Sequence, residues 1–161
     1  MLPATPPIID PRLLADVKSS EGCKLTAYRD TRGNWTIGYG HLLDQTIDWT
    51  GHTITQATAD GLLAQDLAVR QQQCEGLPEW SALDTACRQN AVTESVFNLG
   101  LGHWRCEFPA TRSALAGKQW ELAATNLLAS PEWIAQVGKA RVARLAGYLS
   151  SGSYGAPPDS A

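Results

Sequence analysis

Two carboxylates and one hydroxyl stand close together near the start of the chain, at Glu21, Asp30 and Thr36. Hydrolysis of a glycosidic bond needs such a pair of acids, one protonated beside the leaving oxygen and one ionised. A hydroxyl next to the ionised carboxylate can hold a water molecule there. These residue types and their spacing therefore indicate general acid and base catalysis as one chemistry open to this chain.

A short helix is predicted over residues 11–21, with Asp10 as its N-cap and Gly22 as a left-handed stop. Val17 and Glu21 lie one turn apart on the apolar stripe of this helix. Glu21 is therefore expected on the buried face, at the helix end where the dipole disfavours negative charge. A glutamate that simply reaches water at a helix edge would show the same pattern.

Strand-favouring residues then predict a small hairpin or three-stranded sheet over residues 25–43, with turn chemistry at residues 30–34. Asp30 would lie at the start of that turn and Thr36 on the returning strand. A strand of this length can double back and bring Asp30 near the end of the first helix. Taken singly, each residue also fits an ordinary role, as a turn aspartate and a strand threonine.

The remainder of the chain is predicted to be helical, which makes the fold class α+β and mainly helical. Thr55 is expected to cap a helix that runs to about Gln73, and the last helix is expected over 139–149. Ser81 with Asp84 resembles a capping box, and the other expected helix boundaries are Gly100, Gly102, Pro109, Gly117 and Pro131. A cleft between sheet and helices is the natural ligand site.

The predicted division of the chain is a flexible arm at 1–10, one domain at 11–154 and a flexible tail at 155–161. Within the domain, a small sheet lobe would span about 23–54 and a helical lobe about 55–154.

Composition narrows the class of protein. The chain has 161 residues, 43% of them hydrophobic, and a net charge of −3, which predicts one globular domain and argues against nucleic-acid binding. The sequence predicts neither a secretory signal nor a membrane span. The four cysteines lack metal-ligand spacing, so no metal is expected; free thiols are the default, although pairing stays open.

The spacing Glu21-x8-Asp30-x5-Thr36, followed by Ile-Gly-Tyr-Gly-His-Leu-Leu at 37–43, closely resembles the T-even phage lysozymes, glycoside hydrolase family 24. Further segments that resemble this family are Gln65-Asp66, Val96 to Gly100, Lys118 to Ala124 and Asn126 to Ser130. The resemblance extends over about residues 12–154. It implies a lysozyme-like fold, in which a small antiparallel sheet lobe and a larger helical lobe flank a cleft.

The resemblance also implies an activity without a cofactor: inverting hydrolysis of the β-1,4 bond between N-acetylmuramic acid and N-acetylglucosamine in bacterial peptidoglycan. By position, Glu21 would protonate the leaving oxygen, Asp30 would activate water and Thr36 would place that water. Four further residues match the family's sugar-binding positions: Leu42, Phe97, Thr111 and Asn126. Thr111 stands where a serine is usual.

Two ion pairs are predicted from the same resemblance and from pattern. Arg141 lies at the edge of the apolar face of the last helix, which makes it the better partner for Glu21, whereas Arg144 points farther toward solvent. His41 is expected to pair with Asp66, although an exposed pair of Asp66 with Arg70 is the alternative. Gly38-Tyr39-Gly40 is expected to let the backbone approach the sugar closely.

Departures from the family concern the stretch from His41 to Asp66, which is shorter than in the best-known member, and the acidic net charge. The first puts any sugar contacts in that stretch in doubt. The second predicts weaker electrostatic capture of the negatively charged wall.

The expected setting is that of an endolysin: a monomer held in the host cytoplasm until lysis, then acting on the periplasmic wall without stable membrane association. A bacterial effector with the same chemistry is the second enzyme hypothesis, and a transglycosylase a weaker one, because Asp30 would then have no task. A hypothesis of another class is a catalytically silent peptidoglycan-binding or virion structural module. The intact set of Glu21, Asp30 and Thr36 favours the enzyme.

Overall fold

A computed structural model describes residues 8–155 of the chain, which divide into two compact units on either side of the boundary between Val69 and Arg70. The predicted arm at 1–10 lies outside the described residues except for its last three positions, and the predicted tail does so from residue 156 on. The boundary between the units falls inside a long helix, α2, which spans Gln56–Glu75.

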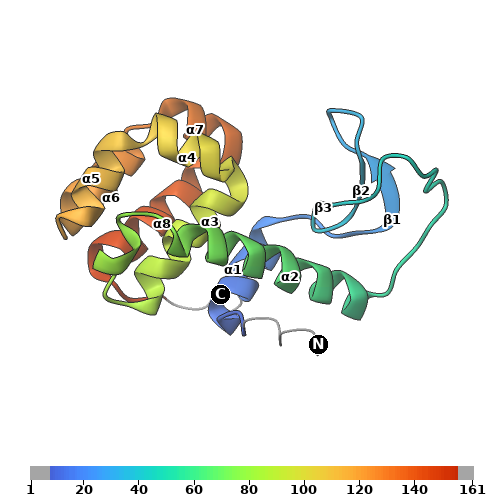
Figure 1. The fold of residues 1–161 in the computed structure, drawn as a ribbon, viewed down its shortest axis with the longest axis horizontal. Coiled ribbons are helices and arrows are strands. Elements are labelled where there is room, and N and C mark those ends of the chain that lie inside the picture. Colours follow the sequence, from blue (N-terminus) through green and yellow to red (C-terminus); the bar gives the residue numbers. More distant parts are fainter. Residues whose placement is uncertain (1–7, 156–161) are drawn as a thin grey trace. The chain divides into compact units, whose positions relative to one another are not determined.

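The first unit begins with helix α1, Pro11–Ser20 (Figure 1). As predicted, Asp10 caps it, because its side chain accepts a hydrogen bond of 2.8 Å from the backbone N–H of Arg12. The stop was predicted wrongly: Glu21 itself is the C-cap, in an extended conformation, and Gly22 is not left-handed. A backbone N–H bond of 2.9 Å from Glu21 to the Val17 carbonyl closes the last turn.

Three short strands follow α1 and form one antiparallel sheet in the order β1-β2-β3. Their bounds are β1 Lys24–Arg29, β2 Trp35–Gly38 and β3 His41–Leu42. The three-stranded sheet therefore confirms the strand prediction. After a loop, α2 begins where the sequence predicted, because the Thr55 hydroxyl accepts a hydrogen bond of 3.1 Å from the N–H of Thr58.

The second unit is helical in its described part. Its elements are the end of α2, the 3-10 helix η1 Trp80–Ala82, α3 Ala86–Leu99, α4 Leu101–Glu107, α5 Pro109–Ala116, α6 Trp120–Leu128, α7 Pro131–Val137 and α8 Lys139–Ser151. A single apolar core joins them, with the tryptophans Trp104 and Trp133 almost fully buried in it. The α+β, mainly helical class predicted from the sequence is confirmed.

Some of the predicted helix boundaries in this unit are found and others are not. Gly100 ends α3 with a positive φ of 83°, as expected. Gly102 ends nothing, because it lies inside α4. The capping box at Ser81 was also wrong: Thr85 caps α3 instead, since its hydroxyl accepts a bond of 3.2 Å from the N–H of Arg88.

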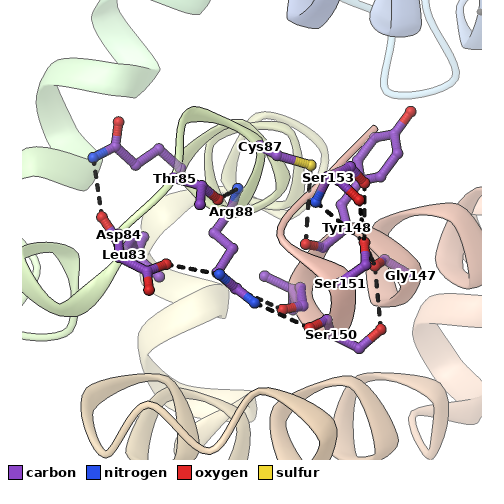
Figure 2. A network of polar contacts seen from close by, with 12 residues as sticks. Leu83, Asp84, Thr85, Cys87, Arg88, Gly147, Tyr148, Ser150, Ser151 and Ser153 are labelled. Atoms are coloured by element: carbon purple, nitrogen blue, oxygen red, sulfur yellow. Dashed lines mark hydrogen bonds and ion pairs between the residues drawn. The ribbon is translucent and has the colours of Figure 1, made fainter. Parts of the chain in front are cut away.

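The C-terminal end of α8 is held by a buried arginine from α3 (Figure 2). Arg88 donates from Nε to the Leu149 carbonyl at 2.8 Å and from Nη2 to the Ser150 carbonyl at 3.0 Å. Its Nη1 also contacts Asp84 at 2.7 Å. The last carbonyls of a helix have no partner within the helix, so this side chain satisfies two groups that would otherwise lack one.

Gly152 ends α8 in the left-handed conformation, with φ 67° and ψ 14°. A Cβ on Gly152 would lie only 2.6 Å from the Arg88 guanidinium carbon. Glycine is therefore required here both for its backbone conformation and for the space that the arginine occupies.

Candidate active site

Asp30 occupies the first position of the tight turn between β1 and β2. Its Oδ1 accepts hydrogen bonds from the backbone N–H groups of Asn34, at 2.8 Å, and Arg32, at 2.9 Å. Its Oδ2 accepts only a longer bond of 3.3 Å, from the Asn34 amide. The backbone donor of Asn34 contributes most to holding the pKa of Asp30 below its ordinary value. The carboxylate is therefore kept ionised, with Oδ2 the less occupied oxygen.

Thr36 lies on β2, directly opposite Tyr28 on β1 and Leu42 on β3. Directly opposed residues of antiparallel strands point to the same face of a sheet, and residues two apart on one strand do so as well. Asp30 follows Tyr28 by two positions, just beyond the end of β1, and its backbone N–H still donates to the Asn34 carbonyl at 2.9 Å. The alternation therefore continues to Asp30, and all four residues belong to one face. The register thus brings the predicted residues Asp30, Thr36 and Leu42 together.

The side chains on this face differ in exposure. Thr36 is buried, and its hydroxyl donates a bond of 3.1 Å to the Asn34 carbonyl. Because that bond uses the hydroxyl hydrogen, the Thr36 oxygen is left as an acceptor. Leu42 is 61% exposed, so its apolar side chain is open to solvent.

Tyr28 is a member of this face that the sequence did not single out. Burial raises the pKa of Tyr28, and the negative charges of Asp30 and Glu21 raise it further. Its phenol is therefore within electrostatic reach of both predicted catalytic acids. The signal in the sequence was the alternation of the strand, which puts position 28 on the same side as position 30.

Glu21 is half-buried and leaves α1 at its C-cap rather than projecting from the last helical turn. One turn earlier, Lys18 reaches α2 and places Nζ 2.8 Å from Oδ2 of Asp60. On its other oxygen Asp60 accepts bonds from the hydroxyl of Tyr39, at 3.1 Å, and the amide of Gln56, at 2.8 Å. This four-residue network fixes the end of α1 against α2, and sequence reasoning did not find it.

The predicted contact between His41 and Asp66 is present. The His41 Nδ1 atom lies 2.9 Å from Oδ2 of Asp66, which joins β3 to α2. The alternative partner, Arg70, instead contacts Gln73 at 2.9 Å. The short strand that carries Leu42 is thereby attached to the longest helix of the chain.

Gly38, the last residue of β2, lies against helix α2. Gly38 has a φ of +65°, and a Cβ there would meet the Ala59 side chain at 3.4 Å. Glycine is therefore favoured at position 38 by the backbone conformation and by the nearby Ala59 side chain, and the closer approach of a sugar to the backbone at 38–40 stays a prediction.

Two of the predicted sugar-binding residues line one pocket of the helical unit. Thr111, at the start of α5, and Asn126, near the end of α6, border a cavity of about 350 Å³ together with Phe108 and Ser130. Thr111 is buried, whereas Asn126 is half-buried. Phe97 lies half-buried near the end of α3.

The two arginines of α8 have partners that the sequence did not predict. Arg144, expected to point toward solvent, instead holds the buried Glu94 of α3 with two bonds of 2.7 and 3.0 Å. Arg141 donates a bond of 2.9 Å to the Asn98 side chain. The pair of Arg141 with Glu21 stays a prediction.

The potential metal ligands are dispersed in the part of the chain that the structure describes. Residues 8–155 contain no cluster of three or more potential metal ligands. Cys23, Cys74 and Cys106 are free thiols. Burial raises the pKa of Cys74 to about 12, so this thiol stays protonated and unreactive. No described helix is long and apolar enough to cross a membrane.

Comparison of the sequence with known protein families gives the class of this protein. The family model described as phage lysozyme matches residues 18–147, and the chain therefore belongs to the phage lysozyme family.

Named relatives agree with this assignment. An endolysin of Acyrthosiphon pisum secondary endosymbiont phage 1 is 35% identical over 88 residues, which are 53% of this chain and 55% of the relative. Two proteins of Dictyostelium discoideum are each 28% identical. "Probable T4-type lysozyme 2" matches over 76% of this chain and 85% of its own, and "Probable T4-type lysozyme 1" over 69% and 78%.

Proposed function

We propose that this protein hydrolyses the β-1,4 bond between N-acetylmuramic acid and N-acetylglucosamine in bacterial peptidoglycan, with inversion at the anomeric carbon. The observation that carries the proposal is the Asp30 turn, where backbone donors keep a carboxylate ionised beside the Thr36 face of the sheet. Family membership supports the same activity.

In this proposal the Asp30 carboxylate is the general base. Its Oδ1 is occupied by two backbone N–H groups, so Oδ2 is the oxygen that takes the proton of the attacking water. The Thr36 hydroxyl donates to the Asn34 carbonyl and keeps a lone pair for the second hydrogen of that water. The water is thereby held between two acceptors with its oxygen directed at the sugar.

Glu21 is the general acid. It gives its proton to the glycosidic oxygen as the bond from that oxygen to the anomeric carbon breaks, while the water oxygen forms the new bond from the opposite face. One displacement inverts the configuration, and Asp30 ends the cycle protonated. Proton exchange with solvent restores both acids.

Substrate contacts are assigned to exposed or pocket-lining positions. Leu42 offers an apolar surface beside Thr36, because the side chain is largely exposed on the same sheet face. Thr111 and Asn126 offer hydroxyl and amide groups in a shared pocket, and Phe97 is proposed as an aromatic contact. The proposed setting is release into the bacterial wall at the end of infection, with lysis of the host as the result.

The test is lysis of permeabilised Gram-negative cells by the wild type and by Glu21→Gln and Asp30→Asn, with circular dichroism to confirm folding. Glu75→Gln, an exposed position at the end of α2, is the matched control. We expect lysis by the wild type and the control and loss of at least a hundredfold in the two site variants. Folded wild type without activity would favour a peptidoglycan-binding module instead.

Stereochemistry is checked separately. NMR of the products at early times should show the inverted anomer of the new reducing end. Anhydro sugar ends would identify a transglycosylase and overturn the roles given to Asp30 and Thr36.

A further inference from the structure

Tyr28 is the residue of the catalytic sheet face to which the proposed reaction gives no task. It stands opposite Thr36 in the register of β1 and β2, and two positions before Asp30 on β1. The side chain is half-buried. Its phenol feels the charges of both Glu21 and Asp30. A sugar held for cleavage between these two acids would therefore lie against Tyr28.

The ring and the hydroxyl of Tyr28 are used differently. The Lys24 ammonium nitrogen lies 4.1 Å from the ring centroid, which holds the ring by a cation–π contact. The hydroxyl forms no hydrogen bond with any residue between 8 and 155. By contrast, the hydroxyl of Tyr39 in the same unit donates to Asp60 at 3.1 Å.

The Tyr28 hydroxyl is not among the buried polar atoms without a partner, so solvent reaches it and a ligand can replace that solvent beside the two carboxylates. Burial, and then the charges of Asp30 and Glu21, raise the pKa of Tyr28 above its ordinary value, so the phenol is neutral near neutral pH. It is then a hydrogen-bond donor beside two carboxyl groups that the proposed reaction already uses, Glu21 as the acid and Asp30 as the base.

We propose that the Tyr28 hydroxyl donates a hydrogen bond to the glycan at the point of cleavage, which makes Tyr28 a substrate-contacting residue between the general acid and the general base. This inference rests on the proposed function. The contact fixes the sugar between Glu21 and Asp30. Lys24 supports it indirectly, by holding the ring.

The test is Tyr28→Phe, which removes the hydroxyl and leaves the ring on Lys24. The value of kcat/KM for a soluble peptidoglycan oligosaccharide is measured from about pH 2.5 to pH 9, so that the acid limb expected below pH 3.8 is included. We expect it to fall about three- to tenfold at every pH, the loss typical of one neutral hydrogen bond, with both limbs of the pH profile unchanged. Tyr154→Phe makes the same chemical change in the helical unit and should leave kcat/KM unchanged.

Three results would overturn the inference while the proposed function stands. One is kcat/KM equal to wild type in Tyr28→Phe, and another is an equal loss in Tyr154→Phe. The third is a displaced limb of the pH profile with an unchanged plateau, because the hydroxyl would then act on the acids and not on the sugar. An inactive wild type is distinct from these, since it removes the proposed function and this inference together.

Discussion

The carboxylate of Glu79 is buried in the helical unit with only 2% of its side chain exposed. Arg112 of α5 holds it with two bonds, from Nε at 2.7 Å and from Nη2 at 3.1 Å. The indole N–H of Trp104 donates to the same carboxylate at 3.1 Å. Arg112→Met keeps much of the apolar stem of the side chain and removes the charge, which leaves a buried carboxylate with a single neutral donor.

The expected cost follows from these contacts. Removing one partner of a buried ion pair costs about 3–5 kcal/mol. The lower end, about 3 kcal/mol, applies because Arg112 is itself 20% exposed and the Trp104 donor remains. For a chain of this length each kcal/mol lowers Tm by about 2–4 °C, so Tm should fall by about 6–12 °C.

The assay is urea unfolding followed by circular dichroism, with Arg105→Met as the control. Arg105 is exposed on the neighbouring helix α4, so its replacement should change the free energy of unfolding by less than about 0.5 kcal/mol. The double variant Glu79→Gln with Arg112→Met should recover part of the loss, because a neutral amide tolerates burial better than an unpaired charge. A change for Arg112→Met no larger than that of the control would refute the reasoning.

Three further predictions concern pH and the backbone. Lys18 lowers the pKa of Asp60, and Asp60 raises the pKa of Lys18. The stability that this pair contributes should therefore be lost as pH falls below about 4 and as pH rises above about 10.5. In unfolding experiments, Asp60→Asn should make the free energy of unfolding less dependent on pH in both of these ranges. Because backbone donors lower the pKa of Asp30, the limb of kcat/KM that reports its ionisation should lie below pH 3.8; a limb well above that value would contradict the proposed base. Gly152→Ala should destabilise the protein by about 1–2 kcal/mol through its left-handed backbone alone. Gly147→Ala, in open space on the same helix, should stabilise the protein by about 1 kcal/mol. A change in the free energy of unfolding that has the same sign for both variants in calorimetry would disprove this prediction.

The sheet face that carries Asp30 and Thr36 was predicted in part from the sequence. Strand-favouring residues over 25–43 and the turn chemistry of residues 30–34 predicted a small hairpin or three-stranded sheet, and the register of β1 and β2 agrees with this prediction. The contact of His41 with Asp66 was also predicted. Tyr28 was not, because a tyrosine in a strand is ordinary until the register shows what stands opposite it.

What the sequence determined by itself is local: the cap of α1 at Asp10, the cap of α2 at Thr55, the stop of α3 at Gly100 and the alternation of the strands. These features depend on side chains that bond their own or nearby backbone, so a short window contains all the groups involved.

Tertiary structure decided which way the long charged side chains turn. Arg144 was placed toward solvent by helical periodicity, yet it holds Glu94, fifty positions earlier in the chain. Lys18 likewise reaches Asp60, forty-two positions later. Periodicity gives the angle of a side chain around its own helix, but the partner that compensates a buried charge comes from another element, and only packing brings the two together.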